Sequence, residues 1–156
     1  MVRSILAVVI TYIAMSALII GVFAGLWLGL GPDRLLEPGS WKGNLFFSIA
    51  APSITVLAGL IGGCLCARIG RGRGPVIALA AIVFVLGMAM CMVTIQKPYP
   101  ADPREPGLTM TQIMEQGREP TWLAVLNPII GAGAVLLSGL AAVRKRMGTA
   151  SPTRGV

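Results

Sequence analysis

Four long uncharged hydrophobic runs dominate the pattern along the chain, and short polar segments separate them. The runs cover residues 5–30, 45–67, 76–95 and 121–143, and none of them contains a charged residue. Crossing a hydrocarbon layer about 30 Å thick takes about 20 residues of α-helix. The pattern therefore predicts an all-α polytopic membrane protein, with four transmembrane helices arranged as two hairpins.

The charged residues divide unevenly between the two sides of the predicted membrane. One side carries both chain ends and the turn at 68–75, with eight basic residues and no acidic one; the other carries five basic residues and all six acidic ones. Because Lys and Arg near span ends favour the cytoplasmic side, we expect both termini to be cytoplasmic. The basic residues that we expect to set this topology and to contact lipid headgroups are Arg68, Arg71, Arg73, Arg144, Lys145 and Arg146.

Composition argues against several classes of function. The net charge of +7 comes from arginines and lysines at span ends, not interleaved with aromatic residues on a folded face, so no nucleic-acid partner is expected. The chain has no histidine and three cysteines. No pattern for a nucleophile and base, a carboxylate dyad or a metal cluster is present. The sequence predicts a non-enzymatic protein without a metal or cofactor.

Two spans carry small residues at four-residue spacing. Such rows let helix backbones approach closely in lipid, where association depends on packing. We expect the row of the first span to pack inside the molecule against the second or the fourth span, with the second span's glycines as its natural partner in a tight hairpin, leaving Val22, Phe23 and Leu26 facing lipid. A seam between copies of the chain, or a contact with another protein, is the alternative. The helix-packing residues are Ala17, Gly21, Gly25 and Gly29 in the first span and Gly59 and Gly63 in the second.

Three residues interrupt the apolar interior of the second and fourth spans. Pro52 and Pro128 each remove a helical hydrogen bond, and Asn127 places an amide where an unpaired polar group is costly. Asn127 must therefore find a partner. An interhelical hydrogen bond is one interpretation, and contact with a substrate or ion beside a broken helix is the other.

The second outer loop and the start of the fourth span form the predicted outer rim. Arg118 and Glu119 stand at the rim, Trp122 lies at the membrane interface, and a capping-box pattern predicts a short surface helix over 109–117. Outer loop one, at 31–44, has turn residues and an interfacial aromatic, Trp41, and suggests no site.

A shift of 76 residues relates parts of the second and fourth spans. It matches Pro52 with Pro128, Gly63 with Gly139 and Arg68 with Arg144. The hypothesis that follows is two parallel hairpins related by an axis along the membrane normal, with the two prolines facing each other in the outer half.

The segment Arg-Glu-Pro-Thr-Trp at 118–122, followed by Asn127 and Pro128, resembles small four-span bacterial membrane proteins. The resemblance implies a bacterial inner membrane and no activity. We expect one transmembrane domain over 1–148 and a disordered tail at 149–156. The predicted function is an accessory or structural subunit that packs with other membrane proteins or with itself. The alternative is a small transporter or channel with an outward-facing cleft at Pro52, Asn127 and Pro128.

Overall fold

The computed structural model describes residues 2–98, 100, 103, 112 and 115–149. In this part of the chain the elements are α1 (Val2–Leu30), a 3-10 turn η1 (Pro32–Arg34), α2 (Leu45–Gly70), α3 (Arg73–Gln96) and α5 (Thr121–Thr149). All four α-helices are long and apolar enough to cross a membrane. The predicted all-α fold with four membrane-spanning helices is confirmed, and α5 extends beyond the predicted span through Arg144, Lys145 and Arg146.

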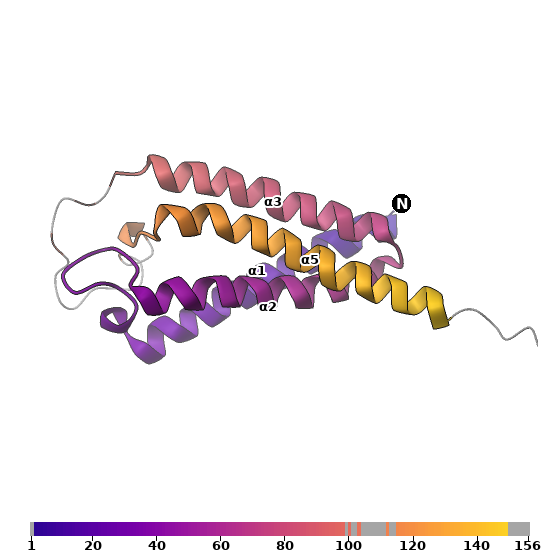
Figure 1. The fold of residues 1–156 in the computed structure, drawn as a ribbon, viewed down its shortest axis with the longest axis horizontal. Coiled ribbons are helices and arrows are strands. Elements are labelled where there is room, and N and C mark those ends of the chain that lie inside the picture. Colours follow the sequence, from indigo (N-terminus) through magenta and orange to yellow (C-terminus); the bar gives the residue numbers. More distant parts are fainter. Residues whose placement is uncertain (1, 99, 101–102, 104–111, 113–114, 150–156) are drawn as a thin grey trace, which may run out of the picture.

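The four helices form an elongated bundle in which neighbours along the chain run in opposite directions (Figure 1). The chain's N-terminus, the turn between α2 and α3 and the end of α5 lie at one end, which we call the terminal end. The loop at 31–44 and the segment at 117–120 lie at the other, the loop end. In this view α1 is the most distant helix and crosses the others obliquely. The most extensive contact joins α2 to α5, followed by α3 with α5 and α1 with α2.

The α2–α5 contact is a seam of small residues. A Cβ added at Gly59 would lie 2.8 Å from the Ala134 Cβ and 2.9 Å from the Gly131 carbonyl oxygen, and one added at Gly63 would lie 2.9 Å from the Gly139 amide nitrogen. Real Cβ atoms do not approach so closely, so these positions need glycine for the two backbones to meet. We call this contact the α2–α5 seam.

The seam follows the 76-residue register of the proposed repeat. Gly63 meets Gly139, a Cβ added at Gly59 would lie 3.4 Å from the Val135 nitrogen, and one added at Gly131 would lie 3.1 Å from the Thr55 Cγ2. In each of these pairs the residue of α5 is 76 positions after the residue of α2. A two-fold axis between parallel helices brings equivalent residues together in this way, so the seam supports the repeat hypothesis.

The two prolines do not face each other along that axis. Pro128 is buried against α3, where a Cβ added at Gly87 would lie 2.8 Å from the Pro128 ring. Pro52 lies inside α2 and is half-buried. Pro52 follows Ala51 and Pro128 follows Asn127, and both of these preceding residues lie on the side of the seam. One step along an α-helix rotates the side-chain direction by about 100°, so the prolines point away from the seam. That part of the repeat hypothesis is wrong.

The packed core lies toward the terminal end. Met15 of α1 fills the space beside Gly62 of α2, and Val76 of α3 lies against Gly139 of α5. Toward the loop end α3 stays on α5, whereas the buried residues of α1 stop at Met15. The bundle is therefore closed at the terminal end and more open around the second half of α1.

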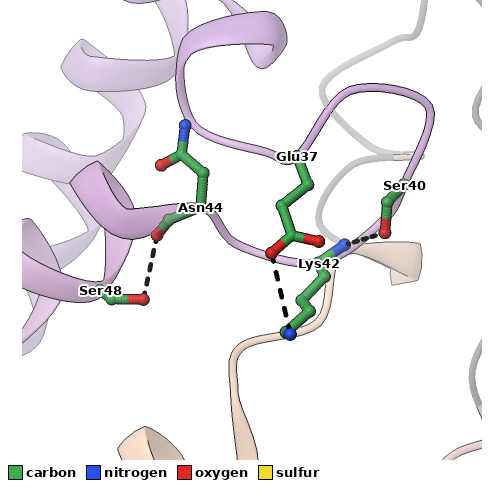
Figure 2. Close-up of polar contacts among 5 residues, drawn as sticks. All are labelled: Glu37, Ser40, Lys42, Asn44 and Ser48. Carbon is green, nitrogen blue, oxygen red and sulfur yellow. Dashed lines mark hydrogen bonds and ion pairs between the residues drawn. The ribbon is translucent and has the colours of Figure 1, made fainter.

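The loop at 31–44 folds compactly over the loop end, with Leu35, Leu36 and Trp41 only 1%, 2% and 7% exposed. Asn44 caps α2, since its side-chain oxygen accepts a hydrogen bond from the Phe47 amide at 3.0 Å. The Lys42 ammonium lies 3.7 Å from the Glu37 carboxylate, and the Ser48 hydroxyl donates to the Asn44 carbonyl at 3.0 Å. Figure 2 shows both contacts. The loop is thus an ordered lid with its own apolar residues.

Two predictions fall mainly outside the described residues. Of the surface helix predicted over 109–117, only Gln112 and 115–117 are described, and Gln112, Glu115 and Gln116 are helical. Of the tail predicted at 149–156, only Thr149 is described, as the last residue of α5.

Candidate functional site

A cavity of about 460 Å³ lies at the loop end between α1, α2 and α5, and Thr94 of α3 also lines it. Apolar and aromatic side chains form most of its wall, and they include Ile19, Phe23, Trp27, Leu36 and Phe47. Its polar side is formed by Arg118, Glu119, Asn127, Thr55 and Thr94. We call this space the loop-end cavity.

The loop at 31–44 positions the polar side of the cavity. The Gly43 amide donates to the Arg118 carbonyl at 2.9 Å, and the Arg118 amide donates to the Trp41 carbonyl at 2.8 Å. These two bonds form an isolated parallel bridge between Lys42 and Arg118. The segment just before α5 is therefore fixed to the lid by backbone bonds, which any side-chain sequence could make.

Arg118 uses only part of its guanidinium for structural bonds. One terminal nitrogen donates to the Glu115 carbonyl at 2.8 Å and to the Gly117 carbonyl at 3.1 Å. The Arg118 Nε is buried and has no hydrogen-bond partner among the described residues. An N–H donor of this cavity-lining residue therefore remains unused.

Glu119 and Asn127 interact directly. The Asn127 side-chain nitrogen donates to the Glu119 carboxylate at 3.3 Å, across two turns of chain. Burial raises the pKa of the Glu119 carboxyl, and the bond from Asn127 opposes this by a smaller amount. The Asn127 Oδ1 is buried and, within the part of the chain that the structure describes, accepts no hydrogen bond.

Two residues of the cavity wall thus carry unused buried atoms, a donor on Arg118 and an acceptor on Asn127. Leaving such an atom without a partner costs about 1–3 kcal/mol each. A bound group that both donates and accepts hydrogen bonds could satisfy the two atoms together. Among the described lining residues, Glu119 carries the one carboxyl group.

The structure separates the three residues of the cleft predicted at Pro52, Asn127 and Pro128. Asn127 lines the loop-end cavity, whereas the two prolines do not. From α2, the residues that line the cavity together with Asn127 of α5 include Ala51 and Thr55. Asn127 bonds to Glu119 on its own side of the bundle, so neither interpretation of its partner foresaw this contact.

The predicted rim residues lie as follows. Arg118 and Glu119 turn inward and line the cavity, while Trp122 is 57% exposed on the first turn of α5. Trp41, expected to lie at the membrane interface, is buried in the lid. The segment 118–119 therefore forms part of the cavity wall in addition to the rim.

The predicted contact between the small-residue rows of α1 and α2 is wrong. Gly59 and Gly63 face α5, and a Cβ added at Gly21, Gly25 or Gly29 would meet nothing within 4 Å. The facing helix decides this, because α5 offers small residues at the heights of Gly59 and Gly63, whereas α1 presents Met15 to α2. Ala17 is exposed as well. We call Ala17, Gly21, Gly25 and Gly29 the α1 row.

The orientation of α1 reverses the lipid-facing prediction for Phe23. The Phe23 ring packs inward against Phe47 of α2, with ring centroids 5.8 Å apart, and both rings line the cavity. Val22 is 40% exposed, as predicted, and Leu26 is half-buried. The outward face of α1 is thus the face that carries the glycines.

The predicted headgroup residues gather at the terminal end, where some also terminate helices. The Arg146 guanidinium donates to the Arg68 carbonyl at 3.4 Å, and Arg71 caps α2 in a left-handed conformation with φ 55°. Ala67, Arg68, Ala142, Lys145 and Arg146 line a smaller cavity of about 290 Å³ between α2 and α5. Arg73 is the first residue of α3, and Arg144 is exposed on α5.

Sequence reasoning missed most of the cavity wall. Phe23, Trp27 and Phe47 sit in apolar runs whose hydrophobicity alone explains them, so no local pattern marks them as lining residues. Ala51 and Thr55 had a usable signal, because the 76-residue shift places them opposite Asn127 and Gly131. Within the described residues, no group of three His, Cys, Asp or Glu side chains is placed to hold a metal ion.

Comparison of the chain with protein-family models, with curated proteins and with solved structures found no match.

Proposed function

We propose that this integral membrane protein has no catalytic role and associates laterally through the α1 row, either with copies of itself or as an accessory subunit of a larger membrane complex. One observation carries the proposal. Ala17, Gly21, Gly25 and Gly29 are all exposed on the outside of the bundle, and a Cβ added at any of the three glycines has no atom of another described element within 4 Å.

Physical considerations support lateral association of this face. A row of small residues gives a transmembrane helix a shallow groove, in which another helix approaches closely and gains dispersion and Cα–H contacts. The molecule already uses such a contact in the α2–α5 seam. The α1 row has the same spacing, and no described part of the chain occupies it, so a helix from another molecule is the natural occupant.

The proposal includes a location and an orientation. We place the protein in a bacterial inner membrane with the terminal end in the cytoplasm, because the basic residues Arg3, Arg68, Arg71, Arg73 and Arg144 all lie at that end. Single cysteines introduced at Ser40 and at Gly148 of a cysteine-free variant test the orientation. A membrane-impermeant maleimide added to intact cells should label the first position and spare the second.

The decisive experiment is lateral association of full-length protein in lipid vesicles. Energy transfer between donor- and acceptor-labelled copies in the vesicles reports self-association. A parallel purification from the native membrane reports complex formation with other proteins. Replacing Gly21 and Gly25 by Leu should abolish energy transfer between copies or remove the co-purifying subunit. Gly133→Leu adds the same bulk at a helical glycine of α5 that also has nothing within 4 Å, and it should leave association unchanged.

Two outcomes oppose the proposal. Recovery of the parent protein only as a monomer, without a co-purifying subunit, would show that the α1 row has no protein partner. Equal loss of association in the Gly133→Leu control would show that added bulk, and not the row, is responsible.

The loop-end cavity favours a second candidate, a small transporter or channel that opens at the loop end. Its support is the hollow lined by Glu119, just before α5, and by Asn127, in the second turn of α5, since polar groups at such positions mark substrate paths. Asn127→Leu should then reduce uptake or leak of a solute by reconstituted vesicles, while Ser53→Ala, at an exposed hydroxyl of α2, should not. Unchanged flux in Asn127→Leu removes this candidate.

A further inference from the structure

The loop-end cavity has the size and wall of a small-molecule site. Its volume of about 460 Å³ falls in the usual range for ligand pockets, about 300–1,000 Å³. The rings of Phe23, Trp27 and Phe47 supply large apolar surfaces on the sides formed by α1 and α2. Such a wall favours an alkyl chain or a flat apolar ring.

The polar side asks for a specific kind of group. Arg118 Nε is an unused donor and Asn127 Oδ1 an unused acceptor, both buried. The hydroxyls of Thr55 and Thr94 already donate to carbonyls of their own helices, at 3.0 Å and 2.9 Å. A ligand hydroxyl offers the complementary group for each of the two atoms, because an O–H group both donates and accepts hydrogen bonds.

The charges in the wall select against ions. Arg118 and Glu119 are neighbours and both line the cavity. A carboxylate ligand would be attracted by the Arg118 guanidinium and repelled by the Glu119 carboxylate. An ammonium ligand would be attracted by Glu119 and repelled by Arg118. Neutral headgroups avoid both penalties and keep the hydrogen bonds.

We propose that the loop-end cavity binds a neutral, hydroxyl-bearing amphiphile of the monoacylglycerol class. Its hydroxyl accepts from Arg118 Nε and donates to Asn127 Oδ1, and its chain lies among Phe23, Trp27 and Phe47. The site does not depend on lateral association, because none of the α1 row lines the cavity.

Tryptophan quenching tests the site in the full-length protein. In a Trp122→Phe background, Trp27 remains in the cavity and Trp41 remains buried in the lid. The protein is placed in phosphatidylcholine nanodiscs and titrated with a monoacylglycerol whose chain is dibrominated. Quenching should saturate with mole fraction, and Trp27→Phe should remove most of it. Matched titrations use a dibrominated fatty acid and a dibrominated alkylamine.

Two variants change the site in independent ways. Asn127→Leu removes the acceptor and should weaken binding by about tenfold, the effect of one hydrogen bond to a buried group. Ala24→Phe adds a ring on the cavity side of α1 and should abolish saturable quenching. Ala14→Phe, at an exposed position of the same helix, is the matched control and should bind like the parent.

Several outcomes overturn the proposal. Quenching that rises without saturation in the parent shows ordinary lipid exposure of Trp27. Equal or tighter binding of the fatty acid or the alkylamine rejects the neutral headgroup. Saturable quenching that survives both Asn127→Leu and Ala24→Phe places the binding elsewhere on the protein.

Discussion

Two rows of small residues at four-residue spacing have opposite surroundings in this protein. In the α2–α5 seam, Gly63 and Gly139 bring two backbones into contact. In the α1 row, Gly21 and Gly25 have the same spacing, yet both lie open on the outside of the bundle. The spacing therefore shows that another helix can approach closely, and it does not show which helix does.

The facing surfaces explain the difference. Opposite Gly59 and Gly63, α5 presents Gly131, Ala134 and Ser138. Small residues of the two helices therefore face each other at the same levels of the bundle. Opposite α2, α1 presents Met15, which fills the space at Gly62 and keeps the two axes apart. Met15 thus turns the α1 row outward, and the second half of α1 borders the loop-end cavity.

The largest loss of stability in the comparison of the α2–α5 seam with the α1 row is expected for Gly63→Ala. The added methyl would collide with the Val135 carbonyl and the Ser138 hydroxyl, and it would lie 2.9 Å from the Gly139 nitrogen. Two of these are backbone atoms of α5, so the helices must separate, at a cost of about 3 kcal/mol. Unfolding by added anionic detergent measures the loss.

The matched change in the α1 row is Gly25→Ala, which meets open space. It should alter the free energy of unfolding by less than about 1 kcal/mol, in the stabilising direction, because alanine is the better helix former. An equal loss of stability at Gly25 and Gly63 would contradict the distinction between the two rows.

A second test removes the residue that orients α1. Met15 is 7% exposed and occupies the space beside Gly62, so Met15→Ala leaves a hole in the core and should cost about 2 kcal/mol or more. Leu28→Ala, at an α1 position 81% exposed, should cost little under the same detergent titration. If Leu28→Ala is the more damaging of the two, α1 is held by its loop-end half.

A smaller effect is expected at the lid that covers the open half. Asn44 accepts from the Phe47 amide at 3.0 Å and donates to the Arg34 carbonyl at 2.8 Å. Asn44→Ala removes the cap of α2 and should cost about 1 kcal/mol. Ser40→Ala, which loses one hydrogen bond from the Lys42 amide, should cost about half of that or less. Faster proteolysis of the lid in Asn44→Ala alone provides a local measurement.

The smallest expected effect is a change in pH dependence at Glu119. Burial raises the pKa of its carboxyl above the ordinary value of 4.5, so the folded state binds the proton more tightly than the unfolded state does. Stability from this group is fully present below the unfolded pKa and is lost as pH rises through the raised, folded-state pKa.

Glu119→Gln keeps an oxygen that accepts from Asn127 and removes the titration. The variant should therefore gain stability relative to the parent as pH rises above 4.5, measured as the difference between their detergent unfolding curves at several pH values. Glu37→Gln, at a side chain 45% exposed in the lid, is the control. A Glu119→Gln difference that stays constant across this range would show that Glu119 titrates alike in both states.

The residues of the fold differ from the residues of the site in how well they could be predicted. Four uncharged runs of spanning length were sufficient for the helices, because each backbone polar group in lipid must bond within its own helix. Gly59 and Gly63 were correctly chosen as packing residues, but their partner was not. Asn127 was recognised as the polar residue that needs a partner, and its partner, Glu119, lies eight residues before it.

The cavity wall could not be predicted from local patterns. Phe23 and Phe47 come from different helices and meet only because α1 turns its aromatic side inward. Arg118 reaches the cavity because the backbone of Trp41 and Gly43 holds it, and backbone bonds leave no mark in the sequence. The 76-residue shift was the one long-range signal, and it identified the register of the α2–α5 seam.

The sequence by itself determined that four helices form, where they begin and end to within a few residues except at the longer C-terminal end of α5, and which residues are small enough for close contact. These properties depend on local hydrophobicity and side-chain volume. Only the tertiary structure decided which small row is buried, which face of α1 looks inward and where the cavity lies. Those outcomes depend on pairs of surfaces that are far apart along the chain. At the contact between α1 and α2, for example, the Met15 side chain fills the space that Gly62 leaves empty, and this pair decides how the two helices meet.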